Sequence, residues 1–377
     1  MKVAGIVFSN LNENKHSCLT ADRTLAALPF ACRYRLVDFA LSNMVNAGIS
    51  NISVITNYNY RSLLDHIGSG KDWDLARRRG GITLFSPFQS ADPKQEIGVY
   101  KTHLEALQSI RGNLEAMKEE LIVMADCEYV FNPDLSDCLR RHTENGCNMT
   151  LLATAGRSLL GEGTNRLFLK ADKEGCLTGA SIGKKAPKGY PLLFTDTFIV
   201  SRLFLLRLLK EAEKRGYTSL SRDFIAAGRE GCDIRVELYE GAVFSVGNFN
   251  DYFNESIRLT RDPLAREALF GNRRRPILTR IHNSSPVKYR GGSCVRESMI
   301  ADDCVIEGRV ENSVLFRDVK VGKGSTVTNC VLFENTYVGQ GCTLNCVVSD
   351  KSVVIEDGRL LSGHSTMPMY IPKDRKV

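Results

Sequence analysis

The hydrophobic positions change their period once along the chain. In the first two thirds, short apolar runs such as 3–8 and 121–126 alternate with segments whose apolar residues recur at helical spacing, such as 36–47 and 102–120. Buried parallel strands form continuous apolar runs of this length, and helices cover both faces of their sheet. The pattern predicts an α/β domain with a mostly parallel, Rossmann-like sheet over residues 1–260.

Residues 292–377 carry an internal repeat instead. A weaker copy comes first and three clearer copies follow it: 297–310, 312–328, 329–344 and 345–360. A period of 16–17 residues with apolar positions in steps of six is typical of a left-handed parallel β-helix, whose coils bury their apolar edges by stacking. The ends of such a stack need a cap or a partner. The Arg- and Pro-containing segment 261–291 has little periodicity and is predicted to be a linker.

Composition narrows the class of function. The chain has 377 residues, is 43% hydrophobic and carries a net charge of +7, with basic and acidic residues interspersed. This distribution favours a solvated surface or the attraction of small anions over nucleic-acid binding. No apolar run approaches the roughly 20 residues of a membrane span, and a full signal peptide is lacking, so we expect a cytoplasmic protein. The twelve cysteines contain no Cys-x-x-Cys and are expected to be reduced.

Two stretches carry a specific resemblance. Residues 19–56 and 66–81 contain LTADRTLAALPFACRYRLVDFALSN and HIGSGKDWDLARRRGG, which resemble bacterial ADP-glucose pyrophosphorylase (glucose-1-phosphate adenylyltransferase). The domain order and the linker agree with that family along nearly the whole chain. The resemblance implies a nucleotidyltransferase domain, and the family's reaction converts ATP and glucose 1-phosphate into ADP-glucose and pyrophosphate with Mg²⁺.

The loop that wraps the nucleotide phosphates in that family departs here from its Gly-Gly-x-Gly-x-Arg pattern. The glycine positions fall on Asn10, Leu11 and Glu13, and the arginine position falls on Lys15. Glycine permits the positive φ and the close backbone approach that a phosphate loop needs. Leu11 adds bulk, Glu13 adds negative charge, and Lys15 lacks the forked geometry of arginine. We therefore expect a degenerate nucleotide site.

The charges that face the phosphates and the metal also change. A family lysine becomes Leu25, and the first metal-binding aspartate matches Asp126. The second is predicted to correspond to Asn250, a neutral amide that suits Mg²⁺ poorly. Asp251 follows directly, but a shift of one residue in a strand would point it to the opposite face. Losing one preorganised charge contact typically costs roughly 10²–10³ in rate, so no catalytic residue is expected to be functional and Asp126 is expected to be a vestigial metal ligand.

The resemblance assigns five further positions. Lys185 and Asp223 correspond to vestigial contacts of the sugar phosphate, and an acid, Asp196, replaces a glycine of the sugar pocket. Arg33 takes the place of a lysine that binds a sugar-phosphate effector in relatives, and Arg35 follows it. We expect these two arginines to form an anion site; the alternative is a surface ion pair.

The departures match the non-catalytic, regulatory branch of the family, the GlgD type. The resemblance implies a catalytically impaired subunit of glycogen biosynthesis that binds no cofactor tightly. It would join a catalytic subunit, which uses Mg²⁺, in a heterotetramer. Two alternatives stay open: an active adenylyltransferase with a rebuilt pocket, and a stand-alone sensor of sugar phosphates. The rebuilt pocket would use Lys15, Lys185, Asp126 and Asp251.

Overall fold

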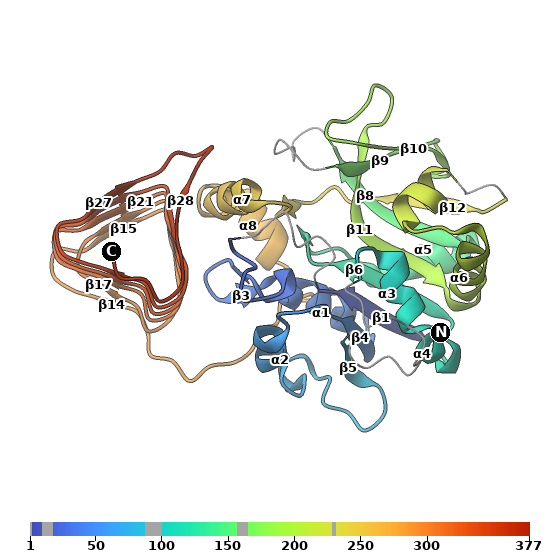
Figure 1. The fold of residues 1–377 in the computed structure, drawn as a ribbon, viewed down its shortest axis with the longest axis horizontal. Helices are drawn as coiled ribbons and strands as arrows, with labels where there is room; N and C mark the ends of the chain where they lie inside the picture. Colours follow the sequence, from blue (N-terminus) through green and yellow to red (C-terminus); the bar gives the residue numbers. More distant parts are fainter. Residues whose placement is uncertain (1, 10–17, 87–99, 157–164, 228–230) are drawn as a thin grey trace.

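The computed structural model describes residues 2–9, 18–86, 100–156, 165–227 and 231–377. Its N-terminal part is built on a nine-stranded mixed sheet in which the order β10-β9-β11-β6-β1-β4-β5 is extended by β8 beside β11 and by β12 beside β8 (Figure 1). The strands are β1 (Val3–Phe8), β4 (Asn51–Ile55), β5 (Gly81–Phe85), β6 (Leu121–Asp126), β8 (Met149–Ala155), β9 (Arg166–Ala171), β10 (Leu177–Gly183), β11 (Leu192–Ser201) and β12 (Ile234–Leu238).

The expected parallel arrangement is confirmed for β5, β4, β1 and β6, whereas β11 runs antiparallel to β6, β8 and β9. Phe8 at the end of β1 pairs with Asp126 at the end of β6. Because these parallel strands end at one edge, the described residues at their carboxyl ends lie together there. This edge carries the predicted nucleotide site.

Helices cover both faces of the sheet, as the alternation of β1 side chains requires. Val7 joins one core with α1 and α5, while Ile6 and Phe8 join another with α3, α4 and α6. The α-helices are α1 (Leu36–Asn46), α2 (Arg61–Ile67), α3 (His103–Ser109), α4 (Arg111–Ala116), α5 (Leu135–Asn145), α6 (Arg202–Arg215), α7 (Phe249–Arg261) and α8 (Pro263–Phe270). Two short 3₁₀ turns, η2 (Leu25–Ala27) and η3 (Lys71–Trp73), and a π-helix, η5 (Leu220–Ala226), complete the helical elements of the described residues. Small strand pairs are β2 (Pro29–Phe30) with β3 (Tyr34–Arg35), and β7 (Tyr129–Val130) with β13 (Phe244–Ser245).

The C-terminal part is a three-sided parallel β-helix, which confirms the predicted repeat architecture. Its first sheet holds β14 (Lys288–Tyr289), β17 (Val305–Ile306), β20 (Lys320–Val321), β23 (Tyr337–Val338) and β26 (Val354–Ile355). Its second holds β15 (Cys294–Arg296), β18 (Arg309–Glu311), β21 (Thr326–Thr328), β24 (Thr343–Asn345) and β27 (Leu360–Ser362). Its third holds β16 (Met299–Ile300), β19 (Val314–Leu315), β22 (Val331–Leu332), β25 (Val347–Ser349) and β28 (Met369–Ile371).

Small apolar side chains fill the coils. Val321 and Val327, six residues apart, are both buried there, as are Val338 and Leu344. The C-terminal end is capped by the chain itself, because the Val354 N–H donates to the carbonyl oxygen of Arg375 at 2.8 Å. All twelve cysteines are free thiols.

The β-helix packs its third sheet against α7, and the two parts share one hydrophobic core. Tyr252 of α7 meets Phe333 edge-on, with 6.3 Å between ring centroids, and Val314 and Val331 belong to the same core. Helix α8, with Ala265 buried, occupies the first part of the predicted linker segment, so extended chain without helix or strand covers only 271–287. The interface is therefore a packed one rather than a flexible joint.

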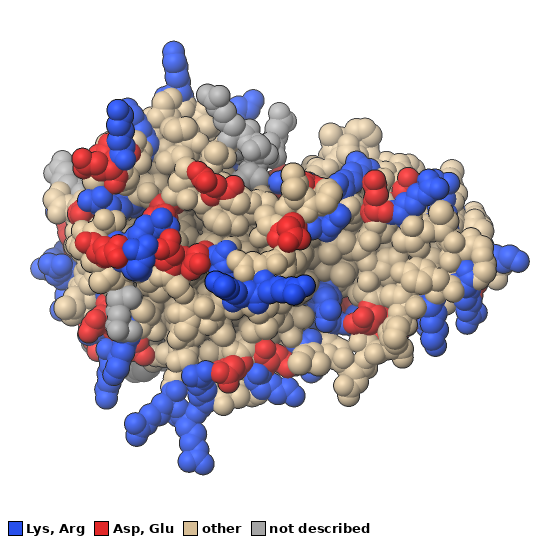
Figure 2. All heavy atoms as spheres, turned by 180° about the vertical axis from the view of Figure 1, so that it is seen from behind, with Lys and Arg blue, Asp and Glu red and all other residues tan. Residues whose placement is uncertain are grey.

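Figure 2 shows Lys and Arg side chains interspersed with Asp and Glu over much of one face of the molecule. Among the described residues, no helix is both long and apolar enough to cross a membrane.

Candidate functional site

The nucleotide edge of the sheet is only partly visible, because Asn10, Leu11, Glu13 and Lys15 lie outside the described residues. The η2 turn, which begins at Leu25, is anchored to the end of β1, because the Ala26 N–H donates to the carbonyl oxygen of Ser9 at 2.9 Å. The Leu25 side chain is only 2% exposed and belongs to the main core. At this position the chain presents a packed hydrocarbon and no cation.

The Asp126 carboxylate is fully engaged at the end of β6. One oxygen accepts the Cys127 N–H at 2.6 Å, and the other lies 3.1 Å from His103 Nε2. His103 opens α3, and its ring stands edge-on to Phe8 with 4.5 Å between centroids. Burial lowers the pKa of His103, but the Asp126 hydrogen bond and the nearby charges of Asp126, Asp196 and Glu128 outweigh burial and leave this pKa raised. The imidazole of His103 therefore occupies the open side of the Asp126 carboxylate and favours its charged form.

The second predicted metal position points elsewhere. Asn250 lies in the first turn of α7, is exposed, and donates from Nδ2 to the carbonyl oxygen of Thr366 in the β-helix at 2.9 Å. Asp251 is buried and pairs with Arg166 Nη2 at 2.8 Å. The segment is a helix and not the strand assumed from the sequence, yet neighbouring side chains still diverge because each helical residue turns by about 100°.

The described residues do not fit the Mg²⁺ ion of the nucleotidyltransferase family. Both oxygens of Asp126 already have partners, Asn250 is engaged with the β-helix, and Arg166 compensates Asp251. Among the described residues no group of three or more His, Cys, Asp or Glu side chains is suited to hold a metal. The structure thus shows charge compensation by the chain's own side chains at this edge.

The two predicted sugar-phosphate contacts lie near the β10 edge of the sheet. Lys185 is exposed in the turn after β10, and η5, which carries Asp223, packs against β10. The Asp223 carboxylate accepts the N–H groups of Thr218 and Ser219 at 2.8 and 2.9 Å. A hydrogen bond from Arg222 holds the pKa of Asp223 well below its ordinary value. Asp223 thus stabilises its own loop. Asp196 has a φ of 49°, in the region that favours the glycine it replaces.

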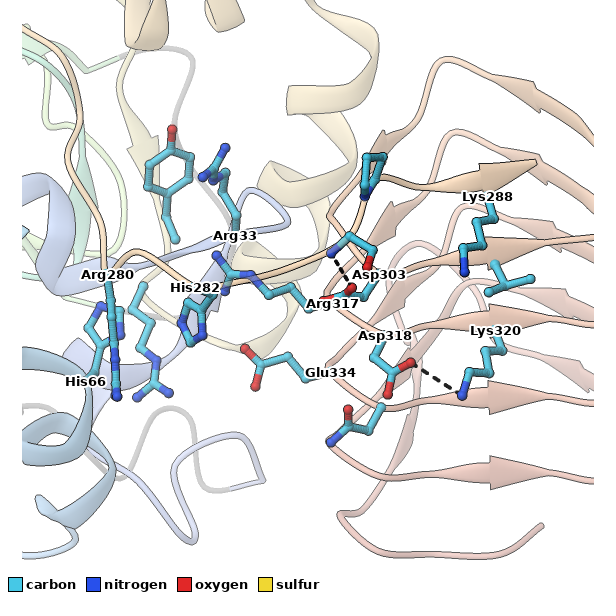
Figure 3. A pocket seen from close by; sticks show the side chains of 16 residues that line it. Arg33, His66, Arg280, His282, Lys288, Asp303, Arg317, Asp318, Lys320 and Glu334 are labelled. Atoms are coloured by element: carbon cyan, nitrogen blue, oxygen red, sulfur yellow. Dashed lines mark hydrogen bonds and ion pairs between the residues drawn. The ribbon is translucent and has the colours of Figure 1, made fainter.

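A second site opens between the two parts of the chain. A cavity of about 620 Å³ lies between β3, the linker and the coils of the β-helix, and Figure 3 shows Arg317 and Glu334 reaching across it toward Arg280. Six cations and two histidines line it, with three carboxylates. The cations are Arg33, Arg35, Arg280, Arg317, Lys288 and Lys320; the histidines are His66 and His282; the carboxylates are Asp303, Asp318 and Glu334.

The cations of this interdomain pocket differ in how they are held. Arg35 Nη1 donates to the Ser62 carbonyl oxygen at 2.6 Å, and Lys320 lies 3.4 Å from Asp318. Arg33 and Arg317 form no ion pair with any described residue, and the buried Nε of Arg317 has no hydrogen-bond partner. Burial, followed by the charges of Arg317 and Arg280, lowers the pKa of His282. The pocket therefore has a positive potential with donors left open.

The structure places Arg33 and Arg35 in the lining of one cavity, and that they form an anion site stays a prediction. The contribution of the β-helix was missed. Lys288, Val305 and Lys320 occupy the same column of its first sheet, so aligning the repeats more fully places both lysines on one face. No sequence pattern would have predicted Arg317 in the pocket, because the direction of its side chain relative to Arg33 depends on how the β-helix packs against the N-terminal part.

Comparisons with known proteins agree with this architecture. The family described as "Nucleotidyl transferase" matches residues 17–158, and the family described as "GlmU-like, C-terminal hexapeptide" matches residues 286–364. The fold is therefore a nucleotidyltransferase domain followed by a left-handed, hexapeptide-type β-helix, as predicted.

Similarity to individual proteins indicates to which family of nucleotidyltransferase-like proteins the chain belongs. The chain is 33% identical to "Glycogen biosynthesis protein GlgD" of Bacillus subtilis over 95% of this chain and 93% of the relative. It is 34% identical to the protein of the same name from Geobacillus stearothermophilus over 86% of this chain and 83% of the relative. "Glucose-1-phosphate adenylyltransferase" of Bacillus subtilis is 26% identical over 83% of this chain and 81% of the relative. The chain belongs to the GlgD family of glycogen biosynthesis proteins.

Proposed function

We propose that the chain is a regulatory, catalytically impaired subunit of ADP-glucose pyrophosphorylase in glycogen biosynthesis. The observation that carries the proposal is the state of Asp126, whose two oxygens are engaged by His103 and by the Cys127 N–H. Catalysis of nucleotidyl transfer relies on Mg²⁺ to clamp the reacting phosphates. A carboxylate whose two oxygens already have partners within the chain offers that ion little, and the buried Leu25 adds no positive charge for the phosphates.

The proposed partner is a catalytic subunit that converts ATP and glucose 1-phosphate into ADP-glucose and pyrophosphate. Both kinds of relative, the GlgD protein and the adenylyltransferase, occur in Bacillus subtilis, which supports a division of labour between two chains. The shared fold supports a mixed assembly of four subunits, because similar surfaces pack into closed symmetric oligomers.

The interdomain pocket supports a regulatory role through a sugar-phosphate effector. Arg33 and Arg317 are unpaired among the described residues and face one cavity, and guanidinium groups bind phosphate through paired N–H donors. Since the cavity lies between the two parts of the chain, an effector there would contact both at once. The same pocket would serve a stand-alone sensor, whereas an active site rebuilt on Asp251 has less support because Arg166 engages that carboxylate.

The test uses the purified chain alone and mixed with a purified catalytic subunit. We expect no ADP-glucose synthesis above background by the chain alone, co-elution of the two chains, and a changed dependence of the partner's rate on sugar phosphates. Robust turnover by the isolated chain would favour the rebuilt enzyme. Anion binding without co-elution would favour the sensor.

A further inference from the structure

A row of alternating charges crosses the interface between the two parts of the chain. Glu334, which lines the interdomain pocket near Arg35, pairs with Lys351 Nζ at 2.6 Å. The backbone N–H of Lys351, and not its ammonium group, donates to Asp350 Oδ1 at 2.7 Å, and the same oxygen pairs with Arg23 Nη2 at 2.7 Å. The order is Arg35, Glu334, Lys351, Asp350 and Arg23.

The far end of this row is deeply buried. Arg23 and Asp350 have side chains that are 4% and 3% exposed. The Tyr370 hydroxyl lies 2.8 Å from Asp350 Oδ2 and 2.9 Å from the carbonyl oxygen of Cys18. The single hydroxyl proton of Tyr370 is donated to one of these two oxygens, so the direct hold of Asp350 on the segment 18–24 is its ion pair with Arg23. This segment leads directly into the η2 turn at the nucleotide edge.

The row contains three cations and two carboxylates, so it carries excess positive charge. Burial lowers the pKa of Lys351 and Glu334 opposes that effect, while the positive charges of Arg35 and Arg23 lower it further. The cations therefore repel one another across the interface. A phosphate group bound beside Arg35 would relieve that repulsion at the pocket end of the row.

We propose that the row from Arg35 to Arg23 couples the interdomain pocket to the nucleotide edge, so that an anion in the pocket tightens the hold of Asp350 on residues 18–28. The proposal rests on the anion site of the proposed function and deepens it by naming the route of regulation. By reciprocity, whatever tightens this hold also strengthens anion binding. The neighbouring coils that carry Glu334 and Lys351 form the rigid link between the two ends.

The experiment measures backbone hydrogen exchange of the peptide 18–28 in the full chain, with and without glucose 6-phosphate, together with calorimetric binding of that compound. We expect saturation to slow exchange by about fivefold or more. Lys351→Met removes the central charge and keeps the length of the side chain. This variant should bind glucose 6-phosphate within about tenfold of the unmodified chain and show no change in exchange. Lys373→Met, an exposed lysine of the same part, is the matched control and should behave like the unmodified chain.

The outcomes separate the two proposals. If glucose 6-phosphate fails to bind, the anion site and the coupling both fall. If it binds without slowing exchange at 18–28, or if Lys351→Met retains the full effect, only the coupling is overturned. Tyr370→Phe gives a second measure, because losing one hydroxyl at the far end of the row should weaken the effect without unfolding the chain.

Discussion

The nucleotide edge and the interdomain pocket differ in whether their charged side chains have partners within the chain. At the edge, each carboxylate of the predicted metal region has an internal partner: the imidazole of His103 for Asp126 and the guanidinium of Arg166 for Asp251. In the pocket, Arg33 and Arg317 stand without an ion pair among the described residues and face a cavity of about 620 Å³. The carboxylates of the nucleotide edge already have partners within the chain, whereas these arginines of the pocket are available to an anion.

This difference in charge compensation determines where ligand binding would be favourable. Burying a charge costs several kcal/mol unless a partner compensates it, so a compensated carboxylate gains little from a metal ion. Open guanidinium groups retain their capacity for a charge-assisted bond, which is roughly twice as strong as a neutral one. If buried carboxylates are compensated at the edge while guanidinium groups stay available in the pocket, substitutions at the edge should change stability and substitutions in the pocket should change anion binding.

The largest effect on stability is expected from removing one partner of a buried ion pair. Arg166→Ala leaves Asp251 buried without its cation and should lower the free energy of unfolding by about 3–5 kcal/mol, measured by urea unfolding. Arg166→Lys should recover part of the loss. The control is Arg290→Ala, which breaks an exposed pair with Glu307 and should leave the unfolding midpoint unchanged. A loss no larger than that of the control would show that the buried pair is not what stabilises this edge.

A pH-dependent effect of similar size is expected one turn along α7. Burial, partly offset by Arg258, raises the pKa of Glu255 from its ordinary 4.5 to about 7. The folded state then holds a proton that the unfolded state releases, so this contribution is complete below pH 4.5 and is lost as pH rises through 7. Glu255→Gln should flatten that decline by about 3 kcal/mol, measured by urea unfolding between pH 5 and 8. Parallel curves for the two proteins would contradict the raised pKa.

The pocket should show the reverse pattern, a change in binding without a change in stability. Arg33→Ala and Arg317→Ala each remove one charge-assisted contact and should weaken glucose 6-phosphate binding by about 10–100-fold, measured by calorimetry. Their unfolding midpoints should stay unchanged because neither guanidinium holds an ion pair with a described residue. Arg359→Ala, at an exposed β-helix arginine, should change neither quantity. Unaltered affinity in both pocket variants would place the anion elsewhere.

Sequence reasoning predicted the architecture better than the sites. The repeat period and the apolar runs predict both folds because each reports on local burial. The pairing of Asp126 with His103 was not predicted, since their positions 23 residues apart meet only when α3 docks on the sheet. The pairing of Asp251 with Arg166 likewise depends on α7 being a helix. The pocket was half predicted: Arg33 and Arg35 came from a local motif, while Arg317 depends on how the β-helix packs.

The smallest effect is expected at Asn250, and it tests whether this position belongs to the region of compensated charges at all. Its exposed amide makes one neutral hydrogen bond to the Thr366 carbonyl oxygen across the interface, so Asn250→Ala should cost about 0.5–1 kcal/mol in urea unfolding. Asn250→Asp should cost somewhat more, because a carboxylate would face that carbonyl oxygen without a donor. The matched change one residue on, Asp251→Asn, should cost more than either, because it removes the carboxylate of the buried Arg166–Asp251 ion pair. If Asn250→Ala lowered the free energy of unfolding as much as Asp251→Asn, position 250 would also stabilise the buried charges of the nucleotide edge. Asn250 would then belong to the same compensated region as Asp251.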